Sequence, residues 1–412
     1  MSKIMMISSD CHAGALPGTY IEYLPEQYRE AGRRWWIGFA REMMSRAGTF
    51  FDQEAVDEYT DKGGSRGIMG KKPDAAPLDD DALMAMLSDE TSAFAPRRGE
   101  FDAAQRAKDL DGDGVAAEVI FPQMVTFGAG LMQYRDEILP EQNLEGIRAY
   151  NRWLSDFCKT NPDRHLGVAL INVDDIDVTV KEIREAKEMG LRGGILLPTS
   201  TGEHPFYHHP RYEPLWTVCE ELDMPLHSHS GWSPDYGDVE SATAMYISEV
   251  DMWPRRAFPA LVWSGAFERH PNLKLVFTEA GSGWILEALR LLEFKAANPI
   301  FKYFTKGLSL SPTEYFARNC YIGASFMPVH EGAMRHRIGV DRLMYGTDYP
   351  HIEGTWPNTL PQLQETFLGY PEDELRAILG RNALEVYDLD EARLAPIVEK
   401  IGLSLADVRG EA

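Results

Sequence analysis

Metal-ligand side chains occur in four short segments of this 412-residue chain, each at the point where an apolar run ends. The segments are Asp10-Cys11-His12, His227-Ser228-His229, Glu279 and Asp348-Tyr349-Pro350-His351. Carboxylate and imidazole groups together bind divalent cations. In a barrel of parallel strands the carboxyl ends meet at one rim, so distant segments can converge there. The sequence therefore predicts a metalloenzyme.

The side-chain pairs of the first two segments share faces, because residues two apart on a strand point the same way. Asp10 and His12 thus point together, and so do His227 and His229. We expect His229, nearer the strand end, to be a metal ligand. His227 lies one layer deeper and could be a second ligand, a partner of a ligand or a substrate contact, so it is a catalytic candidate. The alternative is a hydrogen-bonded buried histidine pair.

The other two segments supply carboxylates. Glu279 follows an apolar strand, and a carboxylate is rarely buried unless it is paired or bound to metal. A surface position at the start of a loop is the alternative. Asp348 could bind the metal, act as a general base toward a metal-bound water, or do both. It could also be a helix cap, but its arrival together with His351 favours a site.

The elements that position these residues follow from the apolar pattern. Short apolar runs alternate with amphipathic stretches from about residue 116 onward, which indicates repeated strand–helix units. Eight strands are expected, at residues 3–9, 116–122, 165–172, 193–197, 224–230, 273–280, 320–325 and 343–347. Helices are expected at residues 141–160, 175–189, 212–222, 254–270, 283–297, 329–338 and 360–368. The predicted fold class is α/β, a (β/α)8 TIM barrel, with an open doubly wound sheet as the alternative.

A long insertion follows the first strand. It contains the aromatic residues Trp35, Trp36, Phe39, Phe50 and Phe51. Long insertions in compact domains commonly form lids or binding loops. We predict a metal-dependent barrel at residues 1–12 and 111–390, an insertion at 13–110 that caps the mouth or makes an oligomer contact, and a C-terminal helical extension at 391–412.

Composition limits the partners. The chain has 41 Lys and Arg against 64 Asp and Glu, a net charge of −23. Such a surface repels phosphate backbones and anionic lipids, so we expect a small-molecule substrate, no nucleic acid and no membrane. The four cysteines form no C-x-x-C pair, and neither a signal peptide nor a spanning segment is present. We expect a cytoplasmic protein, with a homodimer as its candidate assembly.

Three segments carry a resemblance to a known family: residues 271–276 (PNLKLV), 345–351 (YGTDYPH) and 380–383 (GRNA). With the strand ends above, they resemble the amidohydrolase-related branch of the amidohydrolase superfamily, which includes aminocarboxymuconate-semialdehyde and resorcylate decarboxylases. The similarity covers residues 116–388 and the first strand. It implies a distorted (β/α)8 barrel with a divalent metal at its carboxyl-terminal mouth, which hydrolyses or decarboxylates small molecules.

The resemblance also implies a ligand set. Asp10 and His12 match the paired ligands of the first strand, His229 the histidine of the fifth, and Asp348 the aspartate of the eighth. Glu279 departs from the pattern, because single-metal members usually have His there. No Lys occurs in residues 193–197, so a carbamylated-lysine bridge is not expected. A carboxylate at 279 moves the preference from zinc toward manganese or iron.

Two alternatives to a hydrolase or decarboxylase remain open. Three carboxylates and three imidazoles suffice for two metals, and the mixture resembles the amidohydrolase-fold non-haem di-iron oxygenases; the six residues are Asp10, Glu279, Asp348, His12, His229 and His351. A dinuclear Fe/Fe or Mn/Fe monooxygenase would need dioxygen and two metals per chain. A catalytically silent binding subunit would hold less than one. We therefore expect one or two divalent ions per chain, and no organic cofactor.

Overall fold

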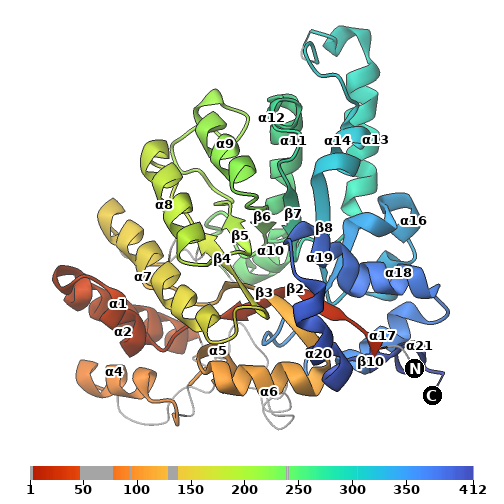
Figure 1. The fold of residues 1–412 in the computed structure, drawn as a ribbon. Helices are drawn as coiled ribbons and strands as arrows, with labels where there is room; N and C mark the ends of the chain where they lie inside the picture. The colour runs from red at the N-terminus through yellow and green to blue at the C-terminus, as the bar shows by residue number, and fades with distance from the viewer. Residues whose placement is uncertain are drawn as a thin grey trace.

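The barrel is present in the computed structural model, which describes residues 3–46, 78–92, 95–128, 138–237, 239, 241–303 and 305–411. Its sheet has eight parallel strands in sequential order: β2 (Met6–Ala13), β3 (Val115–Pro122), β4 (His165–Leu170), β5 (Gly194–Leu196), β6 (Leu226–His229), β7 (Leu275–Thr278), β8 (Cys320–Ser325) and β9 (Leu343–Gly346). The chain after β9 returns to β2, because the amide of His12 donates to the carbonyl of Tyr349 at 2.6 Å. The predicted (β/α)8 fold class is confirmed (Figure 1).

Helices cover the outside of the sheet. They include α7 (Pro140–Lys159), α8 (Ile176–Glu188), α9 (Glu213–Glu221), α11 (Ala257–Trp263), α12 (Ala266–Arg269), α13 (Trp284–Ala297), α15 (Val329–Gly332), α16 (Arg335–Ile338) and α17 (Thr359–Phe367). The helix α8 begins where the sequence predicts it, because the side chain of Asp175 caps the helix by accepting hydrogen bonds from backbone amides of its first turn. The helix α14 (Pro312–Asn319) was not expected, although Ser311 and Glu314 form a capping box at its start.

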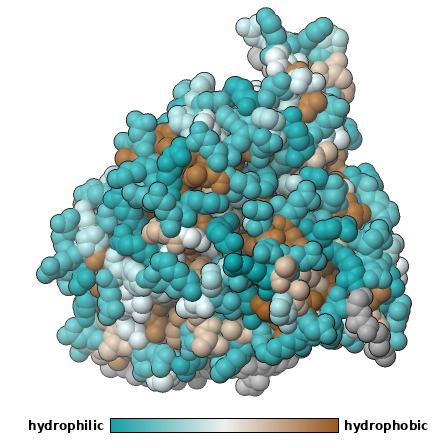
Figure 2. Space-filling view, viewed as in Figure 1, coloured by the Kyte–Doolittle hydropathy of each residue, from teal (hydrophilic) through white to brown (hydrophobic). Residues whose placement is uncertain are grey.

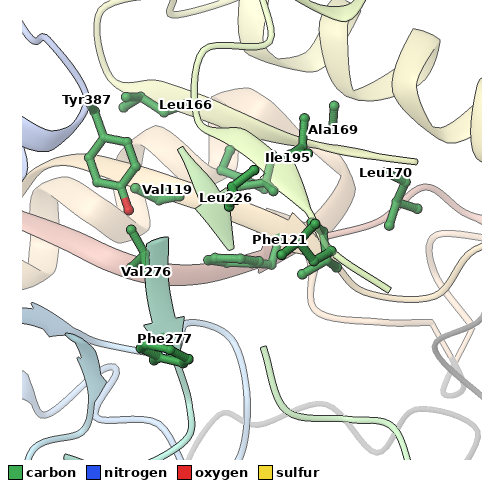
Figure 3. Close-up of a cluster of buried hydrophobic side chains, with 14 of the residues drawn as sticks. Val119, Phe121, Leu166, Ala169, Leu170, Ile195, Leu226, Val276, Phe277 and Tyr387 are labelled. Atoms are coloured by element: carbon green, nitrogen blue, oxygen red, sulfur yellow. The ribbon is translucent and has the colours of Figure 1, made fainter. Parts of the chain in front are cut away.

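The interior of the barrel is packed with side chains rather than open. Val119, Phe121, Leu166 and Val276 point into one cluster (Figure 3). Tyr387, which follows α19 (Asn382–Val386), joins them from outside the sheet. Branched and aromatic residues of this kind fill the core of such barrels. Because the interior is filled by side chains, a site for a substrate must lie at the rim of the barrel.

The insertion after the first barrel strand is helical where it is described. It contains α1 (Pro17–Tyr23), α2 (Glu26–Arg46), α4 (Asp80–Ser88), α5 (Arg98–Phe101) and α6 (Ala103–Asp113). Trp35, Trp36 and Phe39 are buried and pack against one another. Phe50 and Phe51 lie outside the described residues. The indole nitrogen of Trp36 donates to the Thr126 hydroxyl at 3.0 Å, which places α2 beside the carboxyl end of β3.

The two ends of the chain lie together (Figure 1). After α20 (Glu391–Ile401), the short strand β10 (Leu403–Ser404) pairs antiparallel with β1 (Lys3–Ile4), and α21 (Leu405–Arg409) follows. The C-terminal segment therefore ties the start of the first barrel strand in place. Within the described ranges, no helix is both long and apolar enough to cross a membrane.

Candidate metal centre

All six side chains expected to bind metal gather at one rim of the barrel. Their ligand atoms form three overlapping groups, each within 4.8 Å: Asp10, His12 and His229; His12, Asp348 and His351; and Glu279, Asp348, His351 and Glu353. They come from β2 and from the ends of β6, β7 and β9. Glu353 was missed by sequence reasoning, although it lies only two residues beyond His351.

The first barrel strand is longer than predicted, and this places two of the candidates. The strand was expected to end at residue 9 but continues to Ala13, with a register shift between Ser8 and Cys11. Asp10 and His12 therefore lie within the strand, and both point to the group. Asp10 Oδ1 is 3.5 Å from His12 Nε2 and 3.4 Å from His229 Nε2. Ser325 donates a hydrogen bond to the other oxygen of Asp10.

A close backbone approach makes room for Asp10. A Cβ atom at Gly346, the last residue of β9, would lie 2.7 Å from the Cβ of Asp10. No real Cβ contact is that short, so only glycine lets the end of β9 pass beside this carboxylate. This explains the glycine in the YGTDYPH segment.

Asp348 and Glu279 have an unusual backbone. Each lies two residues or fewer beyond the end of its strand with a positive φ, 56° for Asp348 and 51° for Glu279. Left-handed conformations are costly for residues other than glycine and cluster at functional sites. Here they turn both carboxylates toward the group. Asp348 Oδ1 lies 3.4 Å from His12 Nε2 and 2.9 Å from His351 Nδ1.

Glu279 lies on the outer side of the group. Its Oε2 atom is 3.5 Å from His229 Nδ1, and it accepts a hydrogen bond from Ser230. Its side chain is 18% exposed, whereas that of Asp348 is fully buried. Burial raises the pKa of Glu279, and the carboxylates of Asp348 and Asp10 raise it further against the opposing effect of His229. Glu279 is therefore partly buried beside the site, and its role as a metal ligand stays a prediction.

Three histidines are oriented by hydrogen bonds on their far nitrogens. His12 Nδ1 donates to the Pro122 carbonyl at 2.9 Å, and His229 Nδ1 donates to that of Ser230 at 3.0 Å. His351 Nε2 donates a hydrogen bond to Gln123 Oε1 at 2.8 Å. Such contacts fix the tautomer and leave the other nitrogen for a metal. Gln123 was not predicted, although it directly follows the end of β3.

The donor atoms fit a divalent cation. Among the described residues, His12 Nε2 and Asp348 Oδ2 are buried and have no hydrogen-bond partner, while Asp348 Oδ1 contacts only His351 Nδ1, at 2.9 Å, and His12 Nε2, at 3.4 Å. Leaving such atoms unpaired costs free energy, and a shared cation would satisfy them together. An all oxygen-and-nitrogen set with carboxylates suits manganese or iron.

The electrostatics of the group also favour positive charge. Burial lowers the pKa of His12, but Asp10 and Asp348 overcome this and raise it to about 10. The pKa of His229 rises to about 9 because Asp10 and Glu279 outweigh the effect of burial. Burial would raise the pKa of Asp10, yet His229 and His12 hold it well below its ordinary value. The carboxylates thus stabilise any cation placed among them.

His227 lies apart from the three groups. It points into the barrel one layer below His229, as predicted, and its Nε2 donates to the Gly193 carbonyl at 2.8 Å. Its ring stacks parallel to Tyr387 with centroids 5.8 Å apart. Burial lowers its pKa to about 3, so the ring is neutral. This geometry favours the buried, hydrogen-bonded interpretation, and a catalytic role for His227 stays a prediction.

A fully buried ion pair supports the strand that carries Asp10 and His12. Arg106 of α6 makes two bonds to Glu118 of β3, at 2.6 and 2.7 Å, and both side chains are 0% exposed. The same guanidinium donates to the carbonyls of His12 at 2.8 Å and Gly99 at 3.1 Å. Two paired bonds give the geometric precision typical of Arg–carboxylate pairs. The insertion thereby fixes the backbone of a candidate ligand.

Known proteins share this architecture. A family model described as Amidohydrolase matches residues 10–389. Gamma-resorcylate decarboxylase of Rhodococcus jostii (strain RHA1) is 25% identical over 236 residues, which are 51% of this chain and 68% of that protein. The structure of 5-carboxyvanillate decarboxylase from Sphingomonas paucimobilis has a TM-score of 0.61 at 19% identity, covering 94% of this chain and 100% of that one.

A second solved structure is that of a dihydroxybenzoic acid decarboxylase from Polaromonas sp. JS666 with bound manganese and the inhibitor 2-nitroresorcinol. It has a TM-score of 0.59 at 18% identity and covers 95% of this chain and 99% of that one. At these identities the structural likeness concerns the fold. It agrees with the barrel seen here.

Proposed function

This chain belongs to the amidohydrolase family, and we propose from this that it is a metal-dependent decarboxylase of a small, carboxylated aromatic compound. Family membership confirms the predicted barrel and the predicted class of metal-dependent enzyme. The named relatives are decarboxylases of hydroxylated benzoates. The observation that carries the proposal is the buried group of carboxylate and imidazole atoms at the mouth of the barrel.

The proposed ligands of the principal ion are Asp10, His12, His229 and Asp348. The ligand atoms of Asp10, His12 and His229 form one group, and Asp348 adjoins it, with Oδ1 3.4 Å from His12 Nε2. His12, His229 and Asp10 are held by hydrogen bonds from the far side. When bound, a divalent cation would hold the substrate carboxylate and a neighbouring oxygen and stabilise the charge that develops as carbon dioxide leaves. Manganese or iron is favoured over zinc by the carboxylate-rich set, and manganese is bound in one of the named solved structures.

Asp348 has a second proposed role as the residue that moves a proton. Loss of carbon dioxide breaks a carbon–carbon bond and leaves an electron pair on the ring carbon, which must take up a proton. When His351 is protonated on both nitrogens and binds no metal, it can pass its Nδ1 proton to Asp348, since Oδ1 and Nδ1 are 2.9 Å apart. Gln123 holds the other nitrogen of His351 and keeps its ring in position. Proton transfer by a positioned side chain contributes about 10²–10⁴-fold to a rate.

An aromatic substrate agrees with the surroundings of the group. The ring of Phe121 lies 4.5 Å from that of His229 and 6.0 Å from that of His12, centroid to centroid. Tyr246 of α10 (Ala242–Glu249) is close enough to Glu279 and Glu353 for both carboxylates to raise its pKa, after burial, to about 12. Phe121 is buried and packs behind the histidines, whereas the partly exposed ring of Tyr246 can contact an aromatic substrate whose carboxylate faces the cation.

The second candidate function is the dinuclear iron monooxygenase. Glu279, Asp348, His351 and Glu353 offer a second position for an ion, and this observation favours it. The decarboxylase relatives do not support it. Predictions that remain untested are the cap role of residues 13–110, the division at 111–390 and 391–412, the cytoplasmic location and the absence of nucleic-acid partners.

The test is turnover of a panel of hydroxybenzoates, with their methyl esters and amides, by manganese-loaded protein with and without dioxygen. Decarboxylation predicts carbon dioxide release at the same rate in both atmospheres, and no reaction of the esters. Hydrolysis of the esters or amides without carbon dioxide release would contradict the decarboxylase proposal and would identify the protein as a hydrolase. Activity lost under strict anaerobiosis, with two metals per chain, would establish the monooxygenase instead.

A further inference from the structure

The hairpin formed by α13, the turn η3 (Pro299–Phe301) and α14 projects beyond the rest of the molecule (Figure 1). Glu293, near the end of α13, accepts a hydrogen bond from the amide of Thr313 at the start of α14 at 2.7 Å, so the two helices are held to each other. Asn298 accepts a hydrogen bond from the amide of Ile300 and orders the turn. The projection is therefore a built element with a defined tip. We call residues 291–303 the arm tip.

The arm tip exposes large apolar side chains. Ile300 and Tyr303 are 80% and 81% exposed, Phe294 is 64% exposed, and Leu291 and Phe301 are also exposed. Apolar residues lie along the projection among hydrophilic ones in the surface view (Figure 2). Scattered single apolar residues are normal on a surface, but a group on a projecting element marks an interaction site.

The charge of this region is opposite to that of the molecule. Residues 291–310 contain Lys295, Lys302 and Lys306 and a single acidic residue, Glu293, which is engaged by Thr313. The whole chain has 41 basic residues against 64 acidic ones. A basic, apolar tip on an acidic molecule is complementary to the surface of another copy of the same chain. Tip-to-tip contact would oppose lysines to lysines, so the tip must meet the body of the partner copy.

A second exposed apolar group offers the receiving surface. Val239, Met245, Ile247 and Met252, on and around α10, are 58%, 40%, 67% and 51% exposed. None of the side chains of α10 is buried. The acidic residues Asp235, Glu249 and Asp251 lie in the same segment. This combination of apolar and acidic side chains complements the arm tip, and we call the described residues 235–237, 239 and 241–252 the α10 surface.

We propose that the arm tip of one copy docks on the α10 surface of a second copy. Reciprocal placement, with each copy giving one tip and receiving one, closes the contact as a two-fold dimer. The Tyr246 hydroxyl of α10 donates to the Gly231 carbonyl at 3.4 Å, and the preceding Ser230 donates to Glu279, so the docked tip covers the outer side of a helix beside the metal centre. The partner of this surface is the chain itself rather than a foreign protein.

The first test measures the oligomeric state of the full-length protein by sedimentation velocity. The wild type should be dimeric at micromolar concentration, and Ile300→Asp should weaken the dimer by about tenfold or more. Lys302→Glu should also weaken it, and added salt should do the same. Leu368→Asp is the matched control, since Leu368 is 70% exposed outside both surfaces. A monomeric wild type, or a dimer unaffected by Ile300→Asp, would overturn the proposal.

The second test locates the contact. All four native cysteines are buried, so Ile300→Cys provides one accessible thiol for a photoactivated cross-linker. Cross-links should join two copies and map to the α10 surface by mass spectrometry. Cross-links between copies that map elsewhere, or none between copies, would refute the assigned docking surface.

Discussion

Replacing Arg106 by Met removes the positive partner of Glu118, a carboxylate with no solvent exposure. Burial raises the pKa of Glu118, but Arg106 and His165 hold it well below its ordinary value, so the group is charged in the folded protein. Breaking a buried pair by removing one partner costs about 3–5 kcal/mol of folding free energy. The carbonyls of His12 and Gly99 also lose a donor, at about 1 kcal/mol each.

A double-mutant cycle separates these effects. In Arg106→Met with Glu118→Leu, the buried carboxylate is gone as well, so most of the loss should be recovered. The two carbonyls then lack a donor, and the buried His165 Nδ1 loses the carboxylate 2.8 Å away. The free energy of unfolding is measured by urea titration of each variant with the metal state held constant. The matched control is Arg393→Met, because its ion pair with Asp163 is exposed and worth about 0–1 kcal/mol. If the double variant is no more stable than the single one, the buried charge is not the source of the loss.

The remaining predictions concern the site and the pH dependence of stability. Asp348→Asn should reduce turnover by about 10²-fold or more without lowering the melting temperature, whereas exposed Asp341→Asn should leave turnover unchanged; normal activity of the first variant would remove Asp348 from the mechanism. Glu279→His should shift the metal content of the purified protein toward zinc, and an unaltered metal ratio would contradict a ligand role. Burial raises the pKa of Asp113 from 3.8 to about 6, against hydrogen bonds from Thr359. The folded state therefore prefers the protonated form of Asp113. The stabilisation of the folded protein by this proton is complete below pH 4 and is lost as the pH rises through 6. As the pH rises from 4 to above 6, the free energy of unfolding of Asp113→Asn should increase by up to about 3 kcal/mol relative to that of the wild type. A stability difference between the two proteins that is independent of pH would refute this prediction.

Most of the barrel could be predicted because its strands are short apolar runs buried on both faces. Residues 320–325 were predicted as a strand, and they form β8 with the same bounds. The first barrel strand was predicted too short, because Ser8, Ser9 and Asp10 look like the end of a strand in sequence. They are buried instead: the Ser8 hydroxyl donates to the Asp10 carbonyl and lies 3.0 Å from the Thr347 hydroxyl, and Ser325 donates to the Asp10 carboxylate.

The candidate site residues that lie at the ends of strands could be predicted from the sequence. Asp10, His12, His229, Glu279, Asp348 and His351 were identified and are brought together. The sequence could not reveal Glu353 or Gln123, because their positions depend on how the loops after β9 and β3 turn. The sequence also could not decide between the possible roles of His227. The contacts of its ring, a hydrogen bond to the Gly193 carbonyl and stacking on Tyr387, depend on the tertiary structure.

The surface features were beyond sequence reasoning for a different reason. Trp35 and Trp36 could have lined a pocket or packed in a core, and only tertiary contacts show that they pack. Ile300 and Tyr303 read in sequence as ordinary apolar residues near a proline turn. Their exposure follows from the projection of the hairpin, which no local pattern predicts.

The central claim is that Asp10, His12, His229 and Asp348 share a divalent cation. The most direct measurement is calorimetric titration of chelator-treated protein with Mn²⁺, combined with elemental analysis of the protein as purified. The wild type should bind one or two ions per chain, and Asp10→Asn with His12→Ala should lose the tighter ion while keeping its fold. Binding of less than one ion per chain by the wild type, or unchanged binding by the variant, would contradict the account.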